Sequence, residues 1–294
     1  MKYIFIFLFL VTFTSFAEND NLSPTKKGLY DIGGFKLYLE CYENNKPKLI
    51  LEQGFGLSGS DGAWMENVTK LSKTFSVCLY DRSGLGKSEK GPIPYTVFDT
   101  ANRLHKLLSI AKVKPPYYFA GHSYASYNIR AYNNLYSNEV LGVVLIDPPP
   151  FGYFHAMATR WPANLHTDNE ELKRMMNFEL GVKNPMFGKI PENVDHLKSY
   201  ELIKSSKTFE DKPLIVVFSK KVKGYINQTE KYDRSFVPKN IAKVMDDLWS
   251  NVELSFKSLS SDTKIIYSKS DKHFLHLTDP ELIVSSIESF VTEN

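Results

Sequence analysis

Short apolar runs alternate with amphipathic segments along most of the chain. Continuous runs rich in Val, Ile, Leu and aromatic residues are typical of strands buried on both faces of a parallel sheet. Such runs occupy residues 48–54, 75–81, 117–121, 140–148, 213–219 and 263–269. Residues 35–43 instead alternate between apolar and polar positions, which predicts a half-buried strand, with residues 28–34 as its hairpin partner.

Segments with helical periodicity separate the apolar runs. Residues 96–111, 124–137 and 280–293 place apolar side chains at intervals of three and four positions. Strands that alternate with helices in this way predict an α/β fold, in which a mostly parallel central sheet is flanked by helices. The early hairpin adds an antiparallel edge to that sheet.

One long stretch, residues 148–211, interrupts the alternation. It contains no clear strand pattern, but residues 169–180 and 194–206 have helical periodicity. We interpret 148–211 as a helical cap inserted between the sixth and seventh strands, with residues 18–147 and 212–294 forming the core. The large apolar side chains of the cap either line an apolar pocket or pack the cap onto the core; they are Met157, Trp161, Met175, Met176, Phe178, Met186 and Phe187.

The N-terminal segment follows a different pattern. Lys2 precedes an apolar run that continues to Phe16, and small residues stand at Ser15 and Ala17. This layout predicts a secretory signal peptide, residues 1–17, and a protein exported to a periplasm or secreted. The alternative is a membrane anchor, but the run is short for a bilayer span of about 20 residues. The rest of the chain has no other long apolar run, so no membrane span is expected after cleavage.

Composition and charge exclude some partners. The 36 basic and 33 acidic residues give a formal charge of +3, which falls to +2 without Lys2 and is too small to indicate binding of nucleic acid. We interpret the lysine-rich segment 219–224 as a solvated loop. Export permits disulfides, so Cys41 and Cys78 form either one bridge or two buried thiols.

Ser123 stands between an apolar run and a helical segment. Gly121 precedes it by two positions and Ala125 follows it by two. A strand that ends in Gly-x-Ser-x-small before a helix is a nucleophile elbow, in which the turn is so tight that the flanking residues must be small. The serine then projects from the turn, and the free N–H groups of the following helix point toward it.

With three further segments, the elbow resembles the α/β-hydrolase fold superfamily, from about residue 30 to the end of the chain. Residues 49–64 resemble the family's loop after its third strand, 79–89 its Asp-Arg-x-Gly-x-Gly-x-Ser turn, and 272–287 its terminal histidine segment. The final elbow glycine of the family is alanine here. Residues 81–88 also end like a phosphate-binding loop, but Asp81 stands where that loop requires glycine.

The resemblance assigns candidate roles in a serine hydrolase. Ser123 is the expected nucleophile and His273 the expected base, with His276 as its nearest competitor. The backbone N–H groups of Phe55 and Tyr124 match the family's oxyanion donors.

The sequence offers more than one candidate for the acidic partner of the histidine. In many relatives it follows the seventh strand, where no Asp or Glu occurs before Glu230. Asp147 matches the position of the acid in the haloalkane dehalogenase-like branch of the superfamily, so we favour it over Glu230 and Asp233. Its expected role is to orient the imidazole and stabilise the imidazolium.

A serine at the elbow argues against epoxide and haloalkane hydrolases of this fold, which use a carboxylate there. The resemblance therefore implies hydrolysis of a carboxylic ester or related acyl bond through an acyl-enzyme, on a small-molecule substrate with an apolar group. An aminopeptidase, an acyltransferase or a non-catalytic ligand-binding protein of the same fold are the alternatives. No cofactor is expected. Asp271, His273, His276 and Asp279 lack the spacing of a metal motif, so no metal is expected either.

Overall fold

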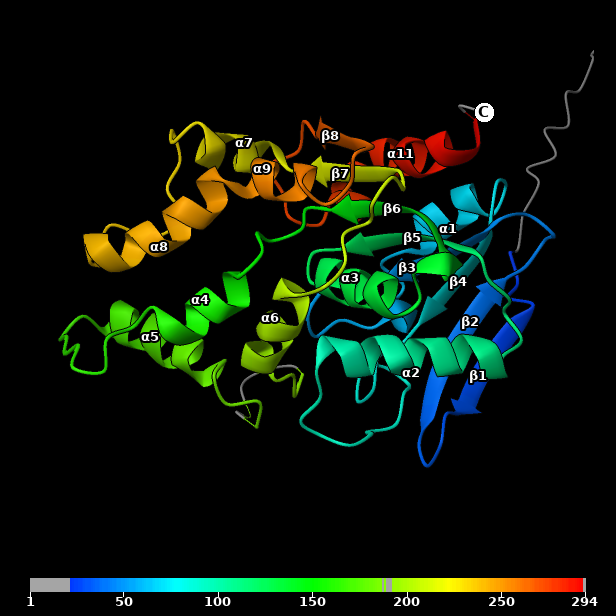
Figure 1. Ribbon diagram of the computed structural model, residues 1–294, viewed down its shortest axis with the longest axis horizontal. Helices are drawn as coiled ribbons and strands as arrows, with labels where there is room; N and C mark the ends of the chain where they lie inside the picture. The colour runs from blue at the N-terminus through cyan, green and yellow to red at the C-terminus, as the bar shows by residue number, and fades with distance from the viewer. Residues whose placement is uncertain (1–21, 187, 189–191, 293–294) are drawn as a thin grey trace, which may run out of the picture.

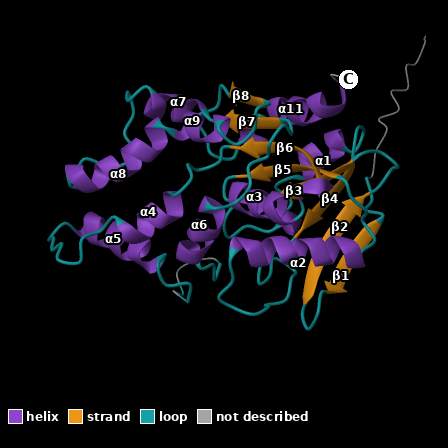
Figure 2. Ribbon diagram, viewed as in Figure 1, coloured by secondary structure: helices purple, strands orange, loops and turns teal. Residues whose placement is uncertain are grey.

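The computed structural model describes residues 22–186, 188 and 192–292; the predicted signal peptide, residues 1–17, lies outside them. A single sheet of eight strands forms the centre, in the order β1-β2-β4-β3-β5-β6-β7-β8 (Figures 1 and 2). β1 and β2 form an antiparallel hairpin, β2 pairs antiparallel with β4, and the remaining neighbours are parallel. The predicted α/β fold with a mostly parallel sheet is confirmed.

Six strands overlap the predicted apolar runs, and the first two overlap the predicted hairpin, residues 28–34 and 35–43. The strands are β1 (Lys26–Asp31), β2 (Lys36–Tyr42), β3 (Lys48–Glu52), β4 (Ser76–Tyr80), β5 (Tyr117–His122), β6 (Val140–Ile146), β7 (Leu214–Phe218) and β8 (Thr263–Tyr267). Side chains alternate between the two faces: in β6, Val143 and Leu145 join the hydrophobic core on one side, while Val144 and Ile146 join the core on the other. Burial on both faces explains why inner strands such as β6 are apolar throughout.

Helices cover both faces of the sheet. α2 (Val97–Ile110) and α3 (Ala125–Leu135) pack into one core, and α1 (Met65–Leu71) and α11 (Pro280–Thr292) into the other. α2 begins at a capping box, in which the Thr96 hydroxyl accepts from the Asp99 N–H and the Asp99 carboxylate accepts from the Thr96 N–H. The remaining helices are α4 (Tyr153–Thr159), α5 (Glu170–Gly181), α6 (His196–Lys204), α7 (Lys220–Ile226), α8 (Lys239–Ser250), α9 (Val252–Lys257) and α10 (Leu275–Thr278), with short 3-10 turns at Gly59–Asp61 and Ser137–Glu139.

Helices α4, α5 and α6 lie between β6 and β7 in the chain, and the described residues between these strands include no strand. The carboxyl ends of β5, β6 and β7 point toward these helices and toward α8 (Figure 1). α8 follows β7, in the part of the chain predicted to be core, yet its Met245 is buried in one cluster with Met157 of α4. The inserted helices and α8 therefore form a common layer, and the role of this layer as a cap stays a prediction.

Two interpretations of short segments are resolved by the fold. Cys41 on β2 lies directly opposite Cys78 on β4, and their sulfurs form a disulfide. The interpretation of 219–224 as a loop is wrong, because Lys220–Ile226 form helix α7. Within the part of the chain that the structure describes, no helix has the length and apolarity needed to cross a membrane.

Candidate active site

Ser123 occupies a strained turn between β5 and α3. Its φ angle is +54°, in the left-handed region that residues other than glycine rarely adopt. The Ser123 N–H donates to the carbonyl of Ile146 on the neighbouring strand, at 2.8 Å, which anchors the turn to β6. A Cβ atom on Gly121 would lie 2.6 Å from the Cβ of Ala125 and 2.6 Å from the Cδ1 of Ile129, so the elbow requires glycine at 121.

Asp147 lies at the end of β6 and holds His273. Its Oδ2 is 2.8 Å from the His273 Nδ1, and its Oδ1 accepts from the Ser219 N–H at 2.7 Å. Asp147 also has a positive φ angle, +44°, and its N–H donates to the carbonyl of Val217 on β7. The carboxylate is buried and fixed from two sides, which leaves the Nε2 of His273 as the ring nitrogen for exchange with a hydroxyl or water.

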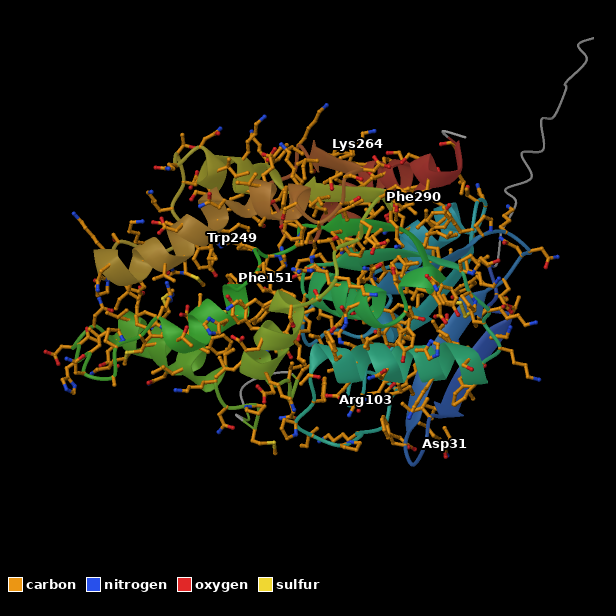
Figure 3. The ribbon with its side chains drawn as sticks, viewed as in Figure 1. Asp31, Arg103, Phe151, Trp249, Lys264 and Phe290 are labelled. Carbon is orange, nitrogen blue, oxygen red and sulfur yellow. A yellow bond between two sulfur atoms is a disulfide. The ribbon has the colours of Figure 1, made fainter. Side chains whose placement is uncertain are left out.

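Ser123, Asp147 and His273 line one cavity of about 410 Å³. Its walls are mainly aromatic and come from α4, α7, α8 and the loop between α7 and α8; they include Pro149, Tyr153, Phe154, Val222, Tyr225, Tyr232 and Trp249. Figure 3 labels Trp249 at the end of α8 that lies toward the sheet. The cavity lies at the carboxyl ends of the parallel strands, where ligands bind in open α/β sheets.

The large apolar side chains proposed for the cap pocket are not the walls of this cavity. Met157 packs against Met245, and Trp161 packs beside Leu172 and Val237, with Met175 and Met176 at the edge of that cluster. Phe178 and Met186 are exposed, and Phe187 lies outside the described residues. For the buried members of this set, packing between helices is therefore their role in the fold.

The two alternative acids have other surroundings. Asp233 forms a buried ion pair with Arg160, which also binds Glu179 through two hydrogen bonds of 2.7 Å. Glu230 is exposed and its side chain lies beside Gly224. Among the described residues, Asp147 is the carboxylate that hydrogen-bonds His273.

Two further histidines lie behind His273. The ring centroid of His122 is 4.5 Å from that of His273 and 4.8 Å from that of His276, and the His122 Nε2 lies 3.0 Å from the carbonyl oxygen of His273. Burial lowers the pKa of His122 well below its usual value, and the neighbouring His273 and His276 lower it further. A neutral His122 therefore donates to this carbonyl and supports the segment that carries His273.

His276, the competitor for the role of base, is fully buried and does not line the cavity. Its ring stacks on Trp64 with centroids 4.4 Å apart. Burial lowers the pKa of His276 to about 4, and His273 adds to this effect. His273, in contrast, has a side chain that is 48% exposed, at the cavity.

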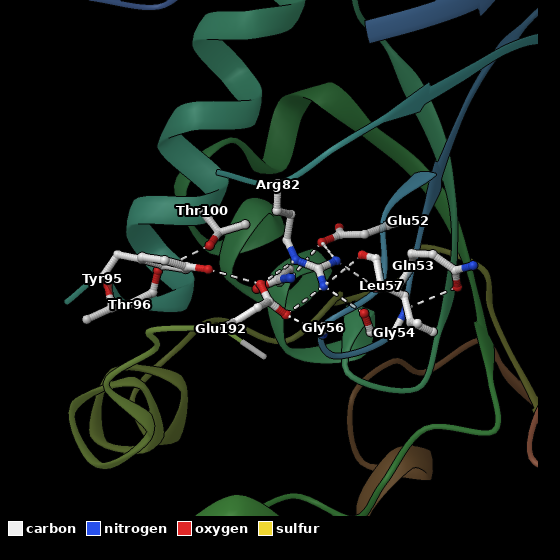
Figure 4. A network of polar contacts seen from close by, with 11 residues as sticks. Glu52, Gln53, Gly54, Gly56, Leu57, Arg82, Tyr95, Thr96, Thr100 and Glu192 are labelled. Atoms are coloured by element: carbon white, nitrogen blue, oxygen red, sulfur yellow. Dashed lines mark hydrogen bonds and ion pairs between the residues drawn. The ribbon is translucent and has the colours of Figure 1, made fainter. Parts of the chain in front are cut away.

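A buried network holds the loop after β3, which carries the predicted oxyanion donor Phe55 (Figure 4). The Arg82 guanidinium donates to the carbonyls of Gln53 and Gly54, at 2.7 and 2.6 Å. It also forms two hydrogen bonds with Glu192, of 2.9 and 2.8 Å, and Glu192 accepts from the Gly56 N–H at 2.7 Å. The loop is thus fixed on both sides of Phe55. No local sequence pattern marks Glu192, because its partners are far away in the chain.

The charges of this network are unequal. Burial would raise the pKa of Glu192, but the Arg82 guanidinium and the hydrogen bonds to Glu192 hold it below its ordinary value. Burial raises the pKa of Glu52 to about 7, although Arg82, with its Nη1 3.6 Å from the Glu52 Oε1, opposes this. Glu192 is therefore the ionised partner of Arg82 at neutral pH.

The backbone N–H groups of Phe55 and Tyr124 are the predicted oxyanion donors. Within the described residues, neither donates a hydrogen bond to another group of the protein. The rings of the two residues contact each other, with centroids 5.2 Å apart, so the loop after β3 and the start of α3 lie side by side. Both N–H groups are therefore free to bind an oxygen atom of a ligand.

Comparisons with known proteins agree with this fold. Residues 47–189 match the alpha/beta hydrolase fold family. A probable transporter, efuK of Hormonema carpetanum, is 24% identical over 309 residues, which cover 92% of this chain but 43% of that protein. The uncharacterized protein YqjL of Bacillus subtilis is 26% identical over 235 residues, with 80% of this chain and 79% of YqjL covered.

Solved structures have the same architecture. A thermophilic esterase from Thermogutta terrifontis superposes with a TM-score of 0.57 at 15% identity, over 91% of this chain and 98% of that one. At this identity the likeness concerns the fold alone. The family match over residues 47–189 and the strand order together support the α/β-hydrolase superfamily for this chain, whose fold is that of the family.

Proposed function

We propose that the protein is a serine hydrolase that cleaves a carboxylic ester or a related acyl bond through an acyl-enzyme. One observation carries the proposal: Ser123 and His273 line the same cavity, and the Nδ1 of His273 is held by Asp147 at 2.8 Å. A serine hydroxyl needs a neighbouring base to become nucleophilic, and an oriented imidazole supplies one.

In the proposed reaction, the Ser123 Oγ attacks the substrate carbonyl carbon while the His273 Nε2 takes the hydroxyl proton. The carbonyl oxygen becomes an oxyanion, which accepts hydrogen bonds from the Phe55 and Tyr124 N–H groups. Collapse of this intermediate breaks the bond to the alcohol, and His273 returns the proton to the leaving oxygen. Water then attacks the acyl-enzyme with His273 as base, and the acid is released. Asp147 stabilises the imidazolium in both halves.

The relatives support the superfamily more strongly than a substrate. The Thermogutta protein is an esterase, which agrees with the proposal, whereas efuK is described as a probable transporter and is more than twice as long as the aligned segment. The N-terminal pattern in residues 1–17 supports export, and the Cys41–Cys78 disulfide is compatible with an oxidising compartment. The proposed activity itself rests on the site.

Labelling with a fluorophosphonate tests the proposal. We expect the purified protein to react once per chain at Ser123, the Ser123→Ala variant to remain unlabelled, and Ser126→Ala, a matched change one turn away on α3, to label normally. Hydrolysis of p-nitrophenyl butyrate should follow the same order. A folded protein that neither labels nor hydrolyses the ester would instead be a binding protein of this fold. Aminoacyl and thioester substrates, with and without an added alcohol acceptor, distinguish the aminopeptidase and acyltransferase alternatives.

A further inference from the structure

A second cavity adjoins the candidate active site. It has a volume of about 640 Å³ and lies over helix α7 and the loop after β8. Lys221, Asp271 and Lys272 line both this cavity and the one that contains Ser123. A molecule bound at the serine can therefore extend past these three residues into the second cavity, which we call the lysine cavity.

The lysine cavity has an excess of positive charge. Its charged lining consists of Lys220, Lys221, Lys223, Lys272, Glu230 and Asp271, a formal charge of +2 from four cations and two anions. A concave surface with an excess of one sign of charge raises the local concentration of ligands of the opposite sign.

The lysines of this cavity differ in their partners. Lys272 forms an ion pair of 3.3 Å with Asp271. Lys221 and Lys223 extend over aromatic rings instead, with Nζ 5.7 Å from the Tyr225 centroid and 5.2 Å from the Tyr267 centroid. Such cation–π contacts hold the side chains in place without neutralising them.

The cavity around Ser123 has a different character. Tyr153, Phe154, Tyr225, Tyr232 and Trp249 give it an aromatic wall. Its volume of about 410 Å³ suits a group of the size of an aromatic ring or a short alkyl chain. Tyr225 belongs to this wall and also carries Lys221, so the apolar and cationic surfaces are continuous.

We propose that the substrate is amphiphilic: an apolar group lies against the aromatic wall, and an anionic oxygen group, a carboxylate or a phosphate, extends to Lys221 and Lys272. The anion binds the two ammonium groups as point charges, because lysine lacks the planar fork of arginine. This inference rests on the proposed function only for the identity of the bond that is cleaved. The expected binding preference follows from the two cavities themselves.

Binding of amides that the protein cleaves slowly or not at all tests the preference separately from catalysis. Calorimetry on the Ser123→Ala variant should show glutaranilic acid, or its phosphonate analogue, binding about tenfold more tightly than the neutral valeranilide. The tighter of the two anions identifies the group. The double substitution Lys221→Met/Lys272→Met, made in the same variant, should remove the preference while valeranilide binds as before. Raising the salt concentration from 20 to 500 mM should weaken the binding of the anion alone.

A matched control removes two exposed lysines elsewhere. Lys173→Met/Lys239→Met changes the net charge equally on α5 and α8 and should keep the preference. Equal affinity of Ser123→Ala for the charged and the neutral amide would overturn the inference. So would a loss of affinity for both amides that is the same in Lys221→Met/Lys272→Met as in the control double variant. Hydrolysis assays of the protein with Ser123 intact, with mono-p-nitrophenyl glutarate and p-nitrophenyl valerate, then test the proposed function. Absence of turnover with both esters would contradict the proposed esterase activity and leave the binding preference unaffected.

Discussion

The Asp147 carboxylate meets a donor at each oxygen. Its Oδ1 accepts from the Ser219 N–H and its Oδ2 lies 2.8 Å from the His273 Nδ1. In Asp147→Asn the amide oxygen must stay on the Ser219 side, so the NH₂ group faces His273 and forces the proton onto Nε2. His273 then cannot accept the proton of Ser123. We expect kcat for p-nitrophenyl butyrate to fall by about 10³- to 10⁴-fold, with a folded protein by circular dichroism.

Glu230→Gln is the matched control, because it makes the same isosteric change at the exposed alternative acid. It should leave kcat within about twofold of wild type, as expected for a surface substitution. A comparable loss of kcat in both variants would mean that Asp147 is not the acidic partner of His273 in catalysis.

Residues of the site differed in how far the sequence could predict them. Ser123 was predictable because a tight elbow demands small residues at 121 and 125, and this requirement lies within five positions. The role of His122 was not predictable in this way, because its ring hydrogen-bonds the carbonyl of His273, 151 positions away. Glu192 is likewise joined to Arg82 across 110 positions. Contacts of this separation leave no local pattern in a single sequence.

At the scale of elements, two buried Arg–Glu pairs provide a matched comparison. Glu192 joins Arg82 and the loop after β3, whereas Glu179 on α5 joins Arg160 and accepts from the indole Nε1–H of Trp161 at 2.8 Å. Every oxygen of both carboxylates accepts a hydrogen bond, so a glutamine at either position turns an NH₂ group toward a donor. We expect Glu192→Gln and Glu179→Gln each to lower the free energy of unfolding by about 3 to 5 kcal/mol.

Their effects on turnover should differ, because the Glu192 pair supports the loop that carries the Phe55 N–H. Below the unfolding transition, kcat should fall roughly tenfold to a hundredfold in Glu192→Gln, since a displaced oxyanion donor costs up to about 10³-fold. Glu179→Gln should keep kcat near that of wild type. Urea denaturation and steady-state kinetics on the same samples measure both quantities. Equal kcat in the two variants would show that the Glu192 pair stabilises the fold without positioning the loop.

Elements were predictable where burial alone shapes the sequence. β6 and β7 are apolar throughout, because both of their faces are covered by helices. Helix α7 was not predictable, because its seven residues, Lys220–Ile226, contain three lysines and are too short to show a helical periodicity. Its position beside the cavity is set by β7, which it follows directly, and by pairing of the Lys220 N–H with the Ser270 carbonyl, at 2.8 Å.

For the whole molecule, the order of strands and helices along the sequence predicted the sheet, but it did not predict which segments surround the cavity. Its aromatic wall combines Tyr153 and Phe154 of α4 with Tyr225, Tyr232 and Trp249 from the region between β7 and β8. The packing of α8 against α4 brings these segments together. The amphipathic pattern of a helix predicts that one face is buried, and it does not say against which partner.

Acid sensitivity should be a property of the whole molecule. Burial lowers the pKa values of His276 and His196 to about 4, against about 6.5 in an unfolded chain. Between these two values the unfolded chain binds protons at both positions and the folded chain does not, so stability falls as the pH falls from about 6.5 toward 4. Glu52, with a pKa raised by burial to about 7, acts in the opposite direction. The individual contributions are therefore best separated by substitution.

His276→Phe keeps a ring against Trp64 and removes the titrating nitrogens. The loss of unfolding free energy between pH 6.5 and 4 should become smaller by up to about 3 kcal/mol, since each pKa unit corresponds to about 1.4 kcal/mol. The same substitution at the exposed His166 is the matched control and should leave the pH dependence as in wild type, because it changes no buried contact. Urea denaturation at half-unit pH steps measures both slopes. An unchanged slope in His276→Phe would mean that His276 accepts a proton in the folded protein. The conclusion that a neutral imidazole stacks on Trp64 would then be wrong.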